Sequence, residues 1–273
     1  MNATGINMLI GASNAMRRVL QQIEQVAPTP APVLIHGEKG VGKTLVAELI
    51  HQESPRRNRS FVKVHCMDTP VDQFEHELFG FEGEAYSGNW NVGTGWLAKA
   101  RGGTIFFDEI TALAPATQIK LLRLLEDRVF EPPGSDTPVS ADIRLLAATR
   151  RSQEQFAHSQ TFRQDLYYRL TVFPIQVPPL REHKTDIPAL AEYFIDRYAR
   201  KHGVTVKGIL APGKSQLMRH RWPGNVRELE ECIEMSILAS TDGWLRIDCR
   251  CCPANFWVDS SHQGAQDISV SSA

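Results

Sequence analysis

A glycine-rich segment between an apolar run and a helix-like stretch constrains the fold of this chain more than any other feature. Residues 33–44 read VLIHGEKGVGKT, with the spacing Gly37-x-x-x-x-Gly42-Lys43-Thr44, and LVAELIH follows at once. Strand, glycine-rich loop and helix in this order let backbone N–H groups surround phosphates. The helix N-terminus adds partial positive charge at the same place. The segment therefore predicts a phosphate-binding loop, and an ordinary glycine-rich turn before a helix is the alternative.

The chemistry of this loop predicts ATP as ligand and Mg²⁺ as cofactor. Lys43 is expected to reach the β- and γ-phosphates, and the Thr44 hydroxyl to ligate Mg²⁺. The residues expected to bind the nucleotide are Gly37, Glu38, Lys39, Gly40, Val41, Gly42, Lys43 and Thr44.

A second pair of functional residues follows a later apolar run. Residues 104–107 read TIFF, and Asp108 and Glu109 come directly after them. Open α/β sheets place ligands at the carboxyl ends of their strands, so both carboxylates are expected in the nucleotide site. Asp108 is expected to hold Mg²⁺ and Glu109 to act as general base on the attacking water. An acidic pair that caps the next helix is the alternative, and the Asp-Glu pair favours hydrolysis over phosphate transfer to another substrate.

Apolar runs alternate with helix-like runs through the first two thirds of the chain. The strand-like runs are 33–36, 61–65, 104–107, 143–147 and 171–177, and the helix-like runs are 44–53, 71–79, 115–128 and about 153–169. Strands that are apolar throughout and separated by helices predict an α/β fold with a parallel sheet covered on both faces. A preceding helix is expected within 6–27, with Ser13 or Asn14 as its cap.

The segment 178–186, PPLREHKTD, ends this alternation, and helical patterns follow it. A helix after Ile187, a short one at 212–220 and a third from Asn225, where Glu228 completes a capping box, predict a small helical domain. We expect an α/β core over 1–180 with an insertion near 80–96, a helical lid over 181–245, and a disordered tail over 246–273 without a helix-turn-helix.

Charge and cysteine usage exclude several classes of protein. The net charge is −1, with 30 basic and 31 acidic residues, so nothing global indicates a nucleic-acid or membrane partner. No apolar run is long enough to span a membrane, and the first residues lack a secretion signal. Cys66 and Cys232 are expected to be buried thiols. Zinc at Cys249, Cys251 and Cys252 is an alternative whose spacing matches no usual pattern, so a reduced cytoplasmic protein is the simplest interpretation.

Two further segments, FRQDLYYRL at 162–170 and WPGNVRELE at 222–230, complete a family resemblance. From about Leu9 to Leu245, the chain resembles the AAA+ ATPase domain of sigma-54-dependent transcriptional activators, the bacterial enhancer-binding proteins. ELFGFEGEAYSGN at 77–89 and the sequence of 168–187 are specific to that family, and the chain looks most like a stand-alone central domain.

The resemblance implies roles for residues outside the phosphate-binding loop. Arg163 and Arg169 match arginine fingers that reach a neighbour's γ-phosphate, which implies self-assembly into a ring, usually a hexamer. Arg227 matches the sensor II residue of the lid, with a surface arginine as the alternative. The loop expected to contact the sigma-54 RNA polymerase holoenzyme, written GAFTGA in the family, is here Glu84, Ala85, Tyr86, Ser87, Gly88 and Asn89.

The chain departs from the family pattern at several of these sites. Glu84 and Asn89 add a charge and a polar side chain to the contact loop, and Pro132-Pro133 alters a second pore-side loop. His65 stands where the family has an asparagine that pairs with the glutamate matched here by Glu109; a histidine can still hydrogen-bond Glu109, with a charge that depends on pH near neutrality. Arg150 follows Thr149 at the sensor I position, where it adds a cation near the expected γ-phosphate.

These observations support one favoured hypothesis and two rivals. The favoured one is an ATP-hydrolysing ring protein that remodels the closed complex of sigma-54 RNA polymerase. The first rival is a hydrolysis-impaired, nucleotide-binding regulatory subunit of a related ring, and the second is another AAA+ remodeller such as a chelatase-like motor. Because no helix-turn-helix pattern follows Leu245, we do not expect this chain alone to bind DNA specifically.

Overall fold

The chain divides into two compact units. The computed structural model describes residues 11–67, 70–80, 95–130, 139–157, 159 and 161–247. The first unit, Met1–Asp186, is called the sheet unit below, and the second, Ile187–Ala273, the helical unit. The expected contact loop at 84–89, Pro132-Pro133, the clustered cysteines and most of the expected tail lie outside the described residues.

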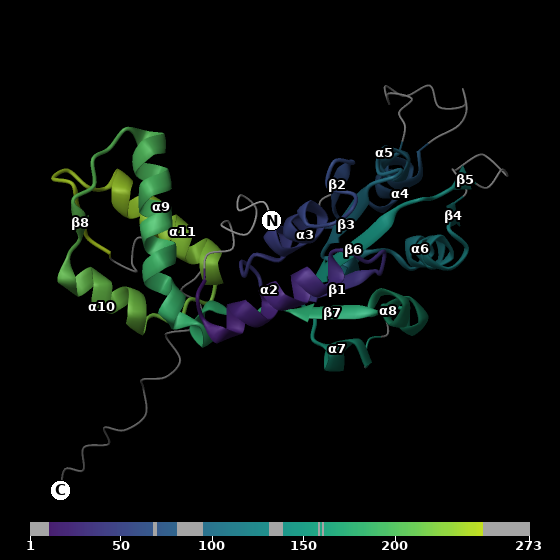
Figure 1. Cartoon of the computed structure of the whole chain (residues 1–273), viewed down its shortest axis with the longest axis horizontal. Coiled ribbons are helices and arrows are strands. Elements are labelled where there is room, and N and C mark those ends of the chain that lie inside the picture. Colours follow the sequence, from purple (N-terminus) through teal and green to yellow (C-terminus); the bar gives the residue numbers. More distant parts are fainter. Residues whose placement is uncertain are drawn as a thin grey trace, which may run out of the picture. The chain divides into compact units, whose positions relative to one another are not determined.

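A five-stranded parallel sheet forms the centre of the sheet unit, in the order β2-β3-β6-β1-β7 (Figure 1). Its strands are β1 (Val33–His36), β2 (Phe61–His65), β3 (Thr104–Asp108), β6 (Arg144–Thr149) and β7 (Phe173–Gln176). Because all neighbouring strands are parallel, their carboxyl ends meet at one edge of the sheet. This arrangement confirms the predicted α/β class.

Apolar side chains are buried on both faces of the sheet, which explains why the strands read as continuous apolar runs. Leu34 and Phe107 belong to one core, and Ile35 and Phe106 to the other. The second core also contains buried residues of α2 (Asn14–Val26) and α3 (Lys43–Gln52). The first contains residues of α4 (Val71–Phe79), α5 (Trp96–Lys99), α6 (Pro115–Asp127) and α8 (Gln164–Leu170).

A buried carboxylate ties the beginning of α2 to the end of the sheet unit. Asp186, only 2% exposed, accepts hydrogen bonds from the backbone N–H groups of Ala12 (2.9 Å) and Ser13 (3.0 Å) and from the Ser13 hydroxyl (2.6 Å). The His183 Nδ1 atom lies 3.0 Å from the same carboxylate. The Ser13 hydroxyl also accepts from a backbone N–H in the first turn of α2, which confirms Ser13 as its cap.

The expectation of one helix over about 153–169 is wrong. The structure has two, α7 (Gln153–Ala157) and α8, with Arg163 extended between them at φ −66° and ψ 133°. The Ser159 hydroxyl accepts a hydrogen bond from the Phe162 N–H at 3.1 Å, and the Gln118 side chain accepts one from the Arg163 N–H at 2.9 Å. Side-chain partners for backbone groups compete with the helical pattern, so the helix is interrupted there.

Short elements complete the sheet unit. They are η1 (Ile110–Ala112), β4 (Val129–Phe130), β5 (Val139–Ser140), η2 (Leu180–Glu182) and η3 (Lys184–Asp186), and β4 pairs with β5 in an antiparallel ribbon. In the part of the chain that the structure describes, no helix is long and apolar enough to cross a membrane.

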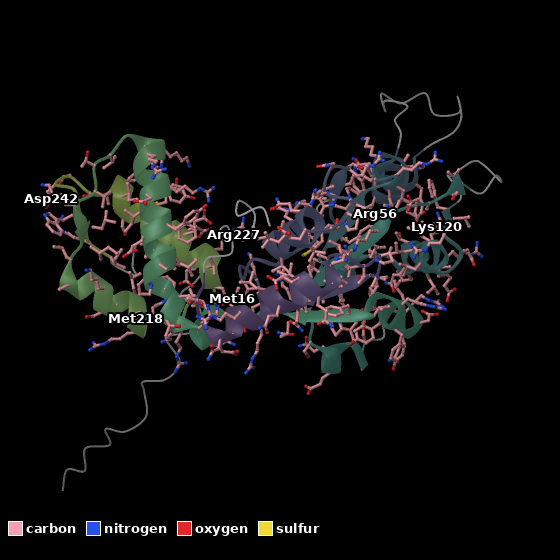
Figure 2. The ribbon with its side chains drawn as sticks, viewed as in Figure 1. Met16, Arg56, Lys120, Met218, Arg227 and Asp242 are labelled. Carbon is pink, nitrogen blue, oxygen red and sulfur yellow. The ribbon has the colours of Figure 1, made fainter. Side chains whose placement is uncertain are left out.

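In the described part of the helical unit, up to residue 247, there are three helices and a short strand pair. They are α9 (Ile187–His202), α10 (Ala211–Arg219), α11 (Asn225–Leu238), β8 (Gly208–Ile209) and β9 (Trp244–Leu245), and the parallel β8–β9 pair was not predicted. Polar contacts join α9 to α11: Glu230 accepts from Arg197 (3.1 Å) and from the Tyr198 hydroxyl (2.7 Å), and Glu234 accepts from Lys201 (2.9 Å). The side chains of Met218, Arg227 and Asp242 are labelled in Figure 2.

The predicted capping box at the start of α11 needs correction. Asn225 is the first helical residue, with φ +56°, and Gly224 is the cap. The Glu228 carboxylate accepts the Gly224 N–H at 2.8 Å, so the glutamate reaches back one residue further than predicted. Because Glu228 is only 2% exposed, burial raises its pKa, although the Gly224 N–H opposes that change.

We expect the two replacements Glu228→Gln and Glu228→Ala to have opposite effects. A raised pKa in the folded state means that the ionised carboxyl destabilises the fold above the unfolded pKa of about 4.3. Glu228→Gln, which keeps an oxygen acceptor, should stabilise the fold at pH 7, by an amount that shrinks toward zero near pH ~4. Glu228→Ala leaves the Gly224 N–H unpaired and should cost about 1–3 kcal/mol. Thermal unfolding of all three proteins across pH measures both; equal losses at pH 7 would contradict the expectation.

Candidate functional site

The phosphate-binding loop connects β1 to α3 at the carboxyl edge of the sheet. Gly40 and Gly42 have φ of +79° and +98°, a backbone region that side chains disfavour. A Cβ atom at Gly37 would lie 2.9 Å from a Val41 methyl group and 3.0 Å from the Val177 carbonyl oxygen. Gly40 and Gly42 of the loop are therefore favoured by their positive φ values, and Gly37 is favoured because a side chain there would meet Val41 and Val177.

Lys43 is buried beneath this loop. Its Nζ atom donates hydrogen bonds to the carbonyl oxygens of Gly37 (2.7 Å) and Glu38 (2.9 Å). Burial lowers the pKa of Lys43, and the nearby charges of Glu109 and Asp108 oppose that change. The fold thus brings the loop lysine and the two predicted carboxylates together, although they are far apart in the sequence.

Arg181, which the sequence analysis did not single out, forms an ion pair with Glu38 of the loop. Arg181, in η2, donates to both carboxylate oxygens of Glu38, at 2.8 and 2.6 Å. Such a two-point contact orients the partner as well as attracting it. The sequence could not predict this pair, because residues so far apart along the chain form no local pattern.

His65 lies beside Asp108. Strands β2 and β3 are paired so that His65 lies opposite Asp108. The His65 Nδ1 atom is 3.6 Å from an Asp108 oxygen, which is within ion-pair range but too long for a hydrogen bond. His65 is therefore placed beside the predicted metal ligand rather than beside the predicted base.

The Glu109 carboxylate is contacted by Arg150. Glu109 has the left-handed conformation φ 59° and ψ 55°, which costs energy in a non-glycine residue and is typical of functional sites. One of its oxygens accepts from the Thr111 hydroxyl (2.8 Å) and from the Arg150 N–H (3.3 Å). The other lies 3.1 Å from Arg150 Nε. The cation expected at the γ-phosphate therefore contacts the predicted general base directly.

Thr149, before Arg150, is fully buried at the end of β6. Its carbonyl oxygen accepts the Gly37 N–H at 3.2 Å, and its hydroxyl accepts the Arg151 N–H at 3.0 Å. The Arg151 guanidinium then donates to the Ser159 hydroxyl at 2.9 Å, in the segment that leads to Arg163. Thr149 is thus bonded to the first loop residue, and Arg151 to the arginine-finger segment.

The predicted arginine fingers project from the surface of the sheet unit around α8. Arg163 makes a two-point contact with Asp165, at 3.0 and 2.6 Å, and Arg169 pairs with Glu126 at 3.0 Å. Both arginine side chains are well exposed, and Tyr168 beside them is 70% exposed. Arg227, the predicted sensor II residue, lies on α11 of the helical unit, 3.8 Å from Glu231 (Figure 2).

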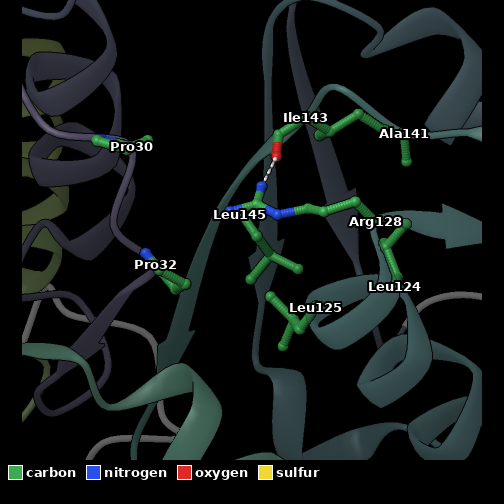
Figure 3. A pocket seen from close by; sticks show the side chains of 8 residues that line it. All are labelled: Pro30, Pro32, Leu124, Leu125, Arg128, Ala141, Ile143 and Leu145. Carbon is green, nitrogen blue, oxygen red and sulfur yellow. Dashed lines mark hydrogen bonds between the residues drawn. The ribbon is translucent and has the colours of Figure 1, made fainter.

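A small apolar crevice lies at the opposite end of the strands from this site (Figure 3). It is bordered by Pro30 and Pro32 before β1 and by Ile143 before β6, whose carbonyl oxygen accepts from Arg128 at 3.4 Å. Its volume of about 10 Å³ holds no more than one water molecule, so it is not the nucleotide site.

The donor set fits Mg²⁺ better than a metal bound by protein ligands alone. Thr44 and Asp108 offer hard oxygen donors, and Mg²⁺ is usually bound by one or two such groups together with substrate phosphates. Among the described residues, no group of three or more histidine, cysteine or acidic side chains is placed to hold a metal ion. Thr44 and Asp108 are thus the residues that would hold Mg²⁺.

A phosphate-binding loop after β1, an Asp-Glu pair at the end of β3, one strand away across β6, and a helical unit after the sheet define a P-loop NTPase of the AAA+ class. Residues 9–176 match the sigma-54 interaction domain, and residues 181–263 match the AAA+ ATPase lid domain. The chain belongs to the family of sigma-54-dependent activators, as the sequence motifs predicted.

Relatives and solved structures agree with this assignment. The chain is 46% identical to the nitrogen fixation protein AnfA of Azotobacter vinelandii over 234 residues, which are 86% of this chain and 44% of AnfA. It is 42% identical to the transcriptional regulatory protein ZraR of Klebsiella oxytoca, over 87% of this chain and 54% of ZraR. The crystal structure of NtrX from Brucella abortus with ATP superposes with a TM-score of 0.82 at 35% identity, over 96% of this chain and 57% of that one. The chain spans about half the length of these relatives.

Proposed function

We propose that this chain hydrolyses ATP and uses the energy to remodel the closed complex of sigma-54 RNA polymerase. One observation carries the proposal: Lys43 of the phosphate-binding loop lies within electrostatic reach of Asp108 and Glu109 at the carboxyl edge of the sheet. The similarity to an NtrX structure that contains ATP supports the nucleotide, and family membership supports the polymerase as partner. Such a partner implies that the chain works in the cytoplasm.

The chain's own residues supply binding and positioning for this reaction. The loop N–H groups and Lys43 would bind the β- and γ-phosphates, and Glu109 would orient the attacking water and accept its proton. Thr44 and Asp108 would hold Mg²⁺, which when bound would supply positive charge to the phosphates. Sensor roles are proposed for Thr149, which is bonded to Gly37, and for Arg227 of the helical unit.

We propose that the chain assembles into a ring, with a hexamer as the expected form. Arg163 and Arg169 are exposed and paired only through surface contacts, which cost little to break. Tyr168 and Val172, 70% and 59% exposed, add apolar surface beside them. Aromatic and arginine side chains are enriched at protein interfaces, so this surface suits a second copy of the chain.

Retention of sigma-54 tests the polymerase partner. With an ATP transition-state analogue that favours ring formation, the chain should retain sigma-54 in a pull-down through the loop at 84–89. Glu84→Gly, which restores the family residue at the first loop position, should increase retention if the altered loop weakens contact. Absence of retention by both proteins under ring-forming conditions would contradict the proposed partner.

A hydrolysis-impaired regulatory subunit is the second candidate function. The contacts of Arg150 with both oxygens of Glu109 favour it, because a general base needs a free oxygen for the water. Steady-state ATP turnover measured against protein concentration separates the two candidates. Turnover that rises steeply with concentration supports the activator, and tight ATP binding with no turnover supports the regulatory subunit.

A further inference from the structure

Arg150 contacts Glu109, the proposed general base, and its charge acts on Lys43 of the phosphate-binding loop. We propose that Arg150 is a positioning residue shared between Glu109 and the γ-phosphate, so that binding of a nucleoside triphosphate draws it away and frees the base. The inference rests on the proposed function, because it assumes that ATP binds at the loop. It assigns to one residue both the restraint of the base and the distinction between ATP and ADP.

The first step is that both oxygens of the Glu109 carboxylate are contacted by Arg150, and one of them also by Thr111. One oxygen receives the Thr111 hydroxyl and the Arg150 N–H, and the other faces Arg150 Nε. The Glu109 side chain is only 14% exposed, so little of it remains open to water. In this arrangement, Arg150 competes with an attacking water for the Glu109 oxygens.

The second step is that Arg150 is within reach of the triphosphate. β1 and β6 are paired so that His36 lies opposite Thr149, which puts Arg150 level with Gly37, the first residue of the loop. The positive charge of Arg150 is close enough to Lys43 to contribute to lowering the lysine pKa. Lys43 is the residue expected to contact the γ-phosphate, so both cations face the same place.

The third step is that the pair is weak enough to exchange. The Arg150 side chain is 48% exposed although Glu109 is only 14% exposed, so the guanidinium can leave the carboxylate without first being released from a buried position. A phosphate group carries more charge than a carboxylate and offers guanidinium a two-point contact. ADP lacks the γ-phosphate, so Arg150 should stay in contact with Glu109 when ADP is bound.

Equilibrium binding tests this inference without relying on activity. We would measure the affinities of AMP-PNP, a non-hydrolysable ATP analogue, and of ADP for the wild-type chain, Glu109→Gln, Arg150→Met and the double variant. If Arg150 is shared, Glu109→Gln should tighten AMP-PNP binding about 5-fold in the wild type but less than about 2-fold in the Arg150→Met protein. ADP binding should change less than about 2-fold throughout.

Arg151→Met is the matched control, because it removes the adjacent positive charge without touching Glu109. It should leave the effect of Glu109→Gln on AMP-PNP unchanged, and thermal unfolding of every variant confirms that each is folded. Equal tightening with and without Arg150 would overturn the inference, since it would reflect only the loss of a negative charge. If the wild-type protein binds AMP-PNP and ADP but the effect of Glu109→Gln does not depend on Arg150, this inference alone is overturned. If the wild-type protein binds neither nucleotide, the proposed function is overturned as well.

Discussion

Replacement of Arg163 or Arg169 by alanine is expected to lower ATP turnover by about 10³-fold or more, the usual effect of removing an arginine finger. The physical reason is that the guanidinium stabilises the charge of the transferring phosphoryl group from a neighbouring subunit. Folding should survive, because Arg169 loses only an exposed contact with Glu126. Steady-state phosphate release per subunit, measured at a concentration that favours assembly, gives the result.

A mixing experiment distinguishes action in trans from a local defect. The Arg169→Ala protein still has Glu109, and the Glu109→Gln protein still has Arg169. In a mixed ring, some active sites would therefore combine Glu109 from one subunit with Arg169 from its neighbour. Combining the two inactive proteins should therefore restore part of the wild-type rate. Arg123→Ala, which removes an exposed arginine on α6 of the same unit, serves as the control and should retain activity. Full activity in Arg169→Ala, or no recovery on mixing, would be evidence against a shared active site.

Replacement of Lys43 by methionine is expected to reduce ATP binding and turnover by about 100-fold or more. The methionine keeps an unbranched apolar side chain of similar length but removes the charge aimed at the phosphates. Burial lowers the pKa of Lys43, so the fold pays a free-energy cost for the charged lysine at pH values below its pKa in the unfolded chain. The variant should therefore unfold at the same temperature as the wild type or slightly above it.

Binding of a fluorescent ATP analogue, phosphate release and thermal unfolding measure the three quantities separately. Lys63→Met, which removes an exposed lysine on β2, is the matched control and should change none of them appreciably. A Lys43→Met protein that unfolds many degrees below the wild type would indicate a mainly structural lysine. Retained ATP affinity in that variant would contradict the assignment of the phosphate-binding loop.

Local pattern predicted most of the elements that surround the site. The apolar runs at 33–36 and 61–65 are strands β1 and β2 with the expected bounds, and α4 spans the predicted 71–79. The Ser13 cap was also predicted, because a cap acts on the N–H groups of the helix that follows it. In the interrupted segment 153–169, by contrast, bonds from Gln118 outweighed the local helical pattern.

Pairings between side chains depended on strand register and backbone direction. The sequence left open a hydrogen bond from His65 to Glu109, and the parallel register of β2 and β3 puts His65 opposite Asp108. The left-handed backbone of Glu109 redirects the chain at the end of β3, and its carboxylate meets Arg150 after β6. Neither the register nor a positive φ at a non-glycine residue can be read from composition or periodicity.

The sequence by itself determined the class of fold, the phosphate-binding loop and the identity of the carboxylates, because each depends on residues that are close together along the chain. Only the tertiary structure decided that Arg150 contacts Glu109 and that Arg181 pairs with Glu38. It also decided that Asp186 accepts hydrogen bonds from the backbone just before α2. Those contacts join residues far apart in sequence. Their geometry is set by the packing of the strands and the turns after them, which no local pattern encodes.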